Sequence, residues 1–175
     1  MKKILSIAAT LLILTTFACQ QKKEQKQQAA PMVSPGPSPM EIEQLKSTAQ
    51  NAPKNAHAWI SLGDALMDSR RFGEAIEAYQ KGLELDPKNV NARVDMGTSF
   101  RAIGKFDKAV EEYRKALKVN PNFPNGRRNL GVVLATDLHQ NKEAIVELQK
   151  YLELAPNAPD AADIKQLIQQ LSLSK

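Results

Sequence analysis

The chain has 175 residues, of which 42% are hydrophobic and 25% charged, which is the composition of one folded domain and not of a disordered chain. Of its net charge of +5, the first 40 residues contribute +4, because residues 41–175 contain 19 basic and 18 acidic residues and have a net charge of only +1. A body without its own excess of positive charge disfavours nucleic-acid binding. Aromatic residues make up only 5%, while Ala, Leu, Lys, Glu and Gln are abundant, which favours helices over strands.

The first 18 residues have the pattern of an export signal. Lys2 and Lys3 give a positive start, and residues 4–18 form an apolar stretch of 15 residues without a charge. This stretch is too short for a comfortable membrane span but has the length of a signal-peptide core. It is the only long apolar run, so a multi-span membrane protein is excluded. The only cysteine, Cys19, follows at once, which excludes an internal disulfide and a cysteine metal cluster.

The junction at Cys19 resembles the lipobox of bacterial lipoproteins. Ala18 matches the small residue before the cysteine, while Thr16 and Phe17 depart from the usual pattern. The resemblance implies a signal peptide over residues 1–18 and acyl chains on Cys19 that hold the protein on a membrane. Because Gln20 and not Asp follows, the sorting pattern of such lipoproteins favours the outer membrane.

Two other interpretations of this segment stay open. Ordinary cleavage would give a soluble periplasmic or secreted protein, and an uncleaved segment would act as a membrane anchor. All three place the folded body outside the cytoplasm. Residues 19–40 lack an apolar period and become rich in Pro and Ser, which predicts a disordered linker between the membrane and the body.

The body contains three copies of a 34-residue period. Three independent columns of residues share this period, and two of them show a single-residue insertion before the last copy. The columns are Gly63, Gly97 and Gly131; Ala75, Ala109 and Ala144; and Pro87, Pro121 and Pro156. The insertion falls between Gly131 and Ala144, in a segment over residues 136–142 that we expect to be a turn.

Each period contains two stretches with apolar residues at helical spacing. In the first copy Trp59, Leu62 and Leu66 give one amphipathic stripe, and Ile76 with Tyr79 begins the second. With the Gly, Ala and Pro columns, these positions resemble the signature of the tetratricopeptide repeat, a helix-turn-helix unit of 34 residues.

The resemblance implies an all-α solenoid of three repeats, at residues 56–89, 90–123 and 124–158. Tyr151 departs from the pattern, because the family has a small residue there. Terminal units of a solenoid need a polar outer face. We therefore expect one extra helix over residues 41–52, placed like half a repeat, and a capping helix over residues 159–172.

The glycine column implies a close contact between helices. Gly63, Gly97 and Gly131 lie in mid-helix, where glycine costs up to about 1 kcal/mol relative to alanine. Such glycines are tolerable where a neighbouring element needs the space. We expect the paired helix to cross at each of them.

Side chains in catalytic arrangements are missing from the sequence. The two histidines, His57 and His139, are far apart in the repeat and have no third partner for a metal site or a catalytic triad. The glycines are spaced by the repeat and do not form a phosphate-binding loop. We expect no catalytic residues, no metal, no cofactor and no enzymatic activity.

In tetratricopeptide-repeat proteins the first helices of successive repeats line a concave groove that holds a peptide or a partner's helix. Carried over to this sequence, the candidate partner-binding residues are Asp64, Asn91, Asp95, Arg101, Asn125, Arg128 and Asn129. The asparagines can hydrogen-bond a peptide backbone, and Arg128 can pair with a carboxylate. Relatives that clamp a C-terminal carboxylate use Lys and Asn where this chain has Ile60 and Asp64, so that specificity is not expected.

The sequence therefore predicts an exported, lipid-anchored module that binds a protein or peptide and helps to assemble or scaffold a cell-envelope complex. We expect it to be a monomer when isolated. Two alternatives remain: a self-associating array of solenoids, and an assembly factor for secreted cofactor proteins that acts on an unfolded client.

Overall fold

The computed structural model describes residues 36–174, and this part of the chain contains eight helices and no strand. The helices are α1 (Pro39–Asn51), α2 (Ala56–Asp68), α3 (Phe72–Leu85), α4 (Val90–Ala102), α5 (Phe106–Val119), α6 (Pro124–Thr136), α7 (Asn141–Leu154) and α8 (Ala161–Leu173). The predicted signal peptide, Cys19 and most of the linker lie outside the described residues. None of the described helices has the length and apolar character needed to cross a bilayer.

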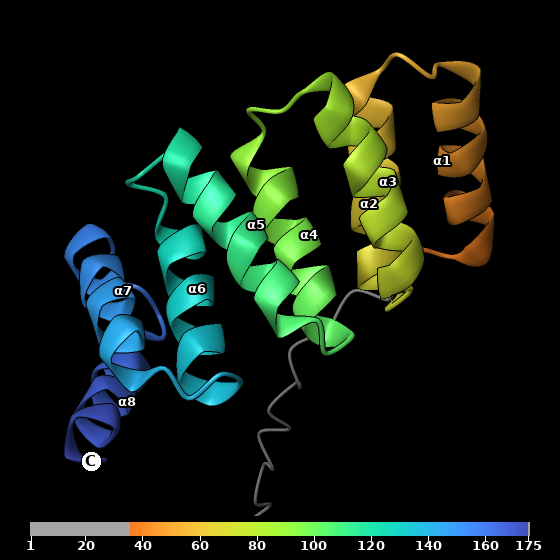
Figure 1. Cartoon of the computed structure of the whole chain (residues 1–175). Coiled ribbons are helices and arrows are strands. Elements are labelled where there is room, and N and C mark those ends of the chain that lie inside the picture. Colours follow the sequence, from red (N-terminus) through yellow and green to blue (C-terminus); the bar gives the residue numbers. More distant parts are fainter. Residues whose placement is uncertain (1–35, 175) are drawn as a thin grey trace, which may run out of the picture. The chain divides into compact units, whose positions relative to one another are not determined.

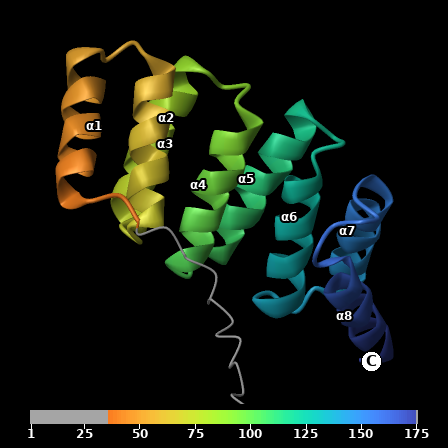
Figure 2. The same cartoon turned by 180° about the vertical axis from the view of Figure 1, so that it is seen from behind.

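The helices form three pairs, α2 with α3, α4 with α5 and α6 with α7, and each pair packs on the next. Figures 1 and 2 show the stack running in chain order from α1 to α8. The first helices of the pairs also touch one another, α2 against α4 and α4 against α6. This arrangement gives a continuous surface made of first helices, which we call the first-helix face.

The helix starts explain where the elements begin. Asn55 and Asn89 precede α2 and α4, and their side chains accept hydrogen bonds from the amides of Ala58 and Ala92. Before α1, the Ser38 side chain accepts from an amide in the first turn and forms a complete capping box. This box starts α1 at Pro39, so residues 39–40 belong to the helix and not to the linker.

The extra residue of the third repeat lies in a loop. Three residues join α2 to α3 and α4 to α5, whereas residues 137–140 join α6 to α7. Each loop has one residue with a positive φ, namely Arg70 at 60°, Gly104 at 75° and His139 at 54°. The insertion therefore lengthens the turn, as the spacing predicts, and leaves both helices of the pair intact.

The glycine column marks the helix crossings. A Cβ on Gly63 would lie 2.7 Å from the ring of Tyr79, and one on Gly97 would lie 2.6 Å from the ring of Tyr113. In the third repeat, Leu148 occupies the equivalent place beside Gly131. The partner helix thus fills the space that a side chain would need, and the predicted crossings are confirmed.

The second and third repeats each contain a buried ion pair that was not predicted from the sequence. Arg93 of α4 pairs with Glu112 of α5 at 2.9 Å, and Arg127 of α6 pairs with Glu147 of α7 at 2.5 Å. The arginines also donate to the carbonyls of Pro87 and Pro121. In the first repeat the indole of Trp59 makes the corresponding bond, to the Pro53 carbonyl at 3.0 Å. This column ties the start of each first helix to the turn before it.

The two terminal helices present polar outer faces. α1 buries Ile42 and Ala49 and exposes mainly Glu, Gln, Lys, Ser and Thr. α8 buries Ala161 and Ile164 and exposes mainly Gln, Lys and Asp. Pro159 and Asp160 form a turn. Helix α8 therefore begins at Ala161, two residues later than expected. Asp160 is the N-cap residue of α8, but its side chain makes no capping hydrogen bond, because its carboxylate accepts from Arg128 and Tyr151.

Candidate partner-binding groove

Four of the seven candidate residues line one cleft on the first-helix face. Its volume is about 450 Å³. The lining residues come from α4, α6, α7 and the turn before α8, and they are Val94, Asp95, Asn125, Arg128, Asn129, Tyr151, Pro159 and Asp160. The cleft therefore lies where the second repeat, the third repeat and the turn into the C-terminal helix meet.

The other three candidates lie outside this cleft, on α2 and α4. Arg101 lines a second cleft of about 420 Å³, between the end of α4 and Asp137. Asp64 of α2 accepts a hydrogen bond from the Tyr79 hydroxyl at 2.8 Å. Asn91 is exposed near the start of α4 and lines neither cleft.

Arg128 is already paired within the chain. Its Nε donates to the Asp160 carboxylate, which also accepts a hydrogen bond from the Tyr151 hydroxyl at 2.5 Å. These two interactions, the tyrosine bond first, hold the pKa of Asp160 below its usual value. Arg128 was predicted to pair with a partner's carboxylate, and it is instead paired with a carboxylate of the turn before α8.

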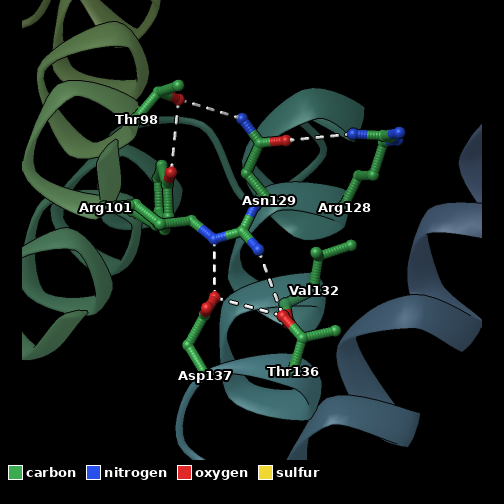
Figure 3. Close-up of polar contacts among 8 residues, drawn as sticks. Thr98, Arg101, Arg128, Asn129, Val132, Thr136 and Asp137 are labelled. Atoms are coloured by element: carbon green, nitrogen blue, oxygen red, sulfur yellow. Dashed lines mark hydrogen bonds and ion pairs between the residues drawn. The ribbon is translucent and has the colours of Figure 1, made fainter. Parts of the chain in front are cut away.

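Asn129 and Arg101 join α4 to α6 (Figure 3). The Asn129 amide donates to the Thr98 hydroxyl at 3.4 Å, and its oxygen accepts from Arg128 at 3.4 Å. Arg101 donates to Asp137 at 2.6 Å and to the Thr136 hydroxyl at 3.1 Å. These contacts fix the position of one first helix relative to the next.

The aspartates of α2 and α4 form the acidic part of the face. Burial, with the charges of Asp64 and Asp68 as further causes, raises the pKa of Asp95 from 3.8 to about 6. Burial likewise raises the pKa of Asp64, while its bond from Tyr79 acts in the opposite direction. Among the described residues the Asp95 carboxylate has no hydrogen-bond partner, in contrast to Asp64.

Comparison with known proteins agrees with this geometry. Residues 56–89 match the family described as tetratricopeptide repeat, and residues 97–137 match a family described as TPR repeat. The chain contains tetratricopeptide repeats. Over 45 residues it is 47% identical to small glutamine-rich tetratricopeptide repeat-containing protein 2 of Mycosarcoma maydis. The match covers 26% of this chain and 13% of that protein.

Solved structures share the tetratricopeptide-repeat fold at low identity. The crystal structure of MamA superposes with a TM-score of 0.67 and 22% identity, over 75% of this chain and 81% of MamA. The TPR2B domain of yeast Sti1, in complex with pHsp70, gives 0.63 and 17%, over 69% of this chain and 98% of that one. The first TPR of Spaghetti (RPAP3), bound to the HSP90 peptide SRMEEVD, gives 0.63 and 24%, over 67% and 94%.

Three residues that line the two clefts were not predicted as site residues from the sequence: Tyr151, Asp160 and Asp137. Tyr151 carried a signal, because it stands where tetratricopeptide repeats have a small residue. A large side chain at that position must occupy space beside the first helix of its own pair. Asp160 and Asp137 lie in turns outside the first helices, where a search limited to those helices could not find them.

Proposed function

We propose that this chain is a non-enzymatic module that binds an extended segment of a partner protein on the first-helix face. The main support is the cleft of about 450 Å³ between α4 and α6. Two of its polar side chains, Asp95 and Asn125, make no hydrogen bond to another side chain among residues 36–174. A side-chain amide offers a donor and an acceptor to a peptide backbone. The tetratricopeptide repeats of the chain support the same class of function, as do the two similar solved structures that hold a peptide or a partner.

A site-specific photo-crosslinker tests this proposal in cells that express the full chain. The probe replaces Asn125 in the cleft, and a matched probe replaces Glu77, which lies on α3 beside a separate cleft next to α1. We expect one dominant partner to be captured from position 125 and not from position 77. Capture from position 77 alone, or from neither position, would contradict the proposal.

The polar outer faces of α1 and α8 favour a binding module over a self-associating array. A solenoid that stacks end to end needs apolar terminal faces, since each repeat contacts only its neighbours. Photo-crosslinkers at Gln44 of α1 and Gln166 of α8, both exposed, would report the alternative. Dimers of the chain crosslinked through either helix would support the array.

We further propose that the module is exported and held on a membrane through acyl chains on Cys19, where it helps to assemble a cell-envelope complex. The support is the sequence of residues 1–20, in which a charge-free stretch ends at the only cysteine. Several acyl chains hold a protein on a bilayer more firmly than one. Metabolic labelling with palmitate should mark the chain in the membrane fraction, and Cys19→Ala should remove the label. A labelled Cys19→Ala protein, or an unlabelled wild type, would refute the anchor.

A further inference from the structure

The charges of the first-helix face specify the kind of partner, if the face binds a peptide as proposed. We infer that the cleft between α4 and α6 takes a cationic side chain, Lys or Arg, from an extended segment of the partner protein, with Asp95 as the residue that faces the cation. The inference thus names the chemistry of the partner for the proposed function.

The positive charges of this face are neutralised within the chain. The charged residues at inward positions of α2 and α4 and in the two clefts are Asp64, Asp68, Asp95, Arg101, Arg128, Asp137 and Asp160. Arg101 pairs with Asp137, and Arg128 pairs with Asp160. The other three aspartates, Asp64, Asp68 and Asp95, have no arginine partner among the described residues, so the face has an excess of acidic groups on α2 and α4.

Asp95 is the aspartate that an incoming side chain would meet inside the cleft. Asp64 accepts the Tyr79 hydroxyl, and Asp68 is exposed at the end of α2. Asp95 is half-buried, lines the cleft and has no hydrogen-bond partner among the described residues. A carboxylate in this setting gains a charge-assisted hydrogen bond when an ammonium or guanidinium group enters.

The remaining groups of the cleft suit a cation better than an anion. Lys and Arg carry only donors, and the side-chain oxygen of Asn125, which lines the same cleft as Asp95, can accept from them. An acidic side chain would face Asp95, and the Arg128 charge is already shared with Asp160. Within residues 36–174, side chains do not group into a metal-binding set of three, so an organic cation fits better than a metal ion.

An array of random-sequence peptides, incubated with the full chain, tests this preference directly. We expect the bound peptides to be enriched in Lys or Arg. In the best-bound peptide, citrulline or Glu then replaces the basic residue, and fluorescence anisotropy gives the affinities. A desolvated charge pair should make the cationic peptide bind at least about tenfold tighter than its citrulline version. The preference should weaken as ionic strength rises.

Two variants locate the effect. Asp95→Asn keeps the shape of the side chain and should reduce the preference for the cationic peptide to less than about twofold. Glu77→Gln removes the same charge from the exposed surface of α3 and should leave the preference unchanged. Circular dichroism checks that both variants are folded.

Several results would overturn the inference. These are equal binding of the cationic and citrulline peptides, tighter binding of the Glu peptide, an unchanged preference in Asp95→Asn, or an array without bound peptides. Its failure is distinguishable from that of the proposed function. A partner captured from position 125 whose bound segment lacks Lys and Arg would refute the cation preference and leave the groove intact.

Discussion

Replacing Asp95 by Asn should stabilise the protein at neutral pH. The unfolded chain gives this carboxyl its ordinary pKa of 3.8, whereas burial and the charges of Asp64 and Asp68 raise the pKa to about 6 in the folded chain. The folded chain therefore holds the Asp95 proton more tightly. The contribution of Asp95 to stability is greatest below about pH 4 and is lost as the pH rises through about 6.

The magnitude follows from the same two pKa values. One pKa unit corresponds to about 1.4 kcal/mol, so a rise from 3.8 to about 6 corresponds to at most about 3 kcal/mol. Asp95 is only half-buried, and solvent screening lowers this to about 1–2 kcal/mol. For a body of this size, about 1 kcal/mol shifts the melting temperature by about 3–5 °C.

Thermal unfolding followed by circular dichroism measures the effect. At about pH 7.5, Asp95→Asn should melt about 3–10 °C above the wild type, and at about pH 4 the two should coincide within about 2 °C. Glu77→Gln is the matched control, since it removes the same charge from the exposed surface of α3. Equal melting temperatures at pH 7.5, or a difference that persists at pH 4, would refute the assignment of a desolvated, repelled carboxylate at Asp95.

Four further single substitutions and one double variant test the packing. Gly97→Ala places a Cβ 2.6 Å from a tyrosine ring of α5 and should destabilise the fold by about 1–3 kcal/mol in chemical denaturation. Gly73→Ala is the contrast, because a Cβ there has no atom within 4 Å, and it should stabilise α3 by about 0.5–1 kcal/mol. Gly104→Ala, at a φ of 75°, should lower stability by about 1–2 kcal/mol, and an unchanged denaturation midpoint would contradict the left-handed turn. Arg127→Ala leaves Glu147 buried without its partner and should destabilise the fold by about 3–5 kcal/mol. The double variant Arg127→Met/Glu147→Leu removes both charges and should come within about 1 kcal/mol of the wild type. Equal losses of stability in the two variants would argue against an ion-pair effect.

The repeat architecture was predictable because its signals are local and periodic. The 34-residue spacing of Gly63, Gly97 and Gly131 indicated where paired helices cross, and the structure places an aromatic or leucine side chain at each crossing. A one-residue shift in the Ala column was enough to place the insertion in the turn before α7. Each of these features depends on a few residues in one helix pair, so the chain order alone contains the information.

The pairing of charges was not predictable in the same way. Arg101 and Asp137 are 36 residues apart, and Arg128 and Asp160 are 32 apart. Whether such side chains meet depends on the rotation of each helix and on the path of the following turn, which sequence spacing does not determine. The candidate residues consequently looked more available to a partner than they are. Arg101 and Arg128, which were predicted to bind a partner, are paired with carboxylates of the chain itself.

Tyr151 links the end of the solenoid to the charge of the cleft. The first repeat has Gly82 at the equivalent position, where a Cβ would lie 2.6 Å from Ile60 of α2, and the second has the fully buried Ala116. A tyrosine cannot occupy so narrow a contact, and in the third repeat its ring lines the cleft while its hydroxyl bonds Asp160. Asp160 is thereby held where it also neutralises Arg128. The residue that departs most clearly from the repeat pattern thus anchors the turn into α8 and leaves the neighbouring Asp95 as the unpaired charge of the cleft.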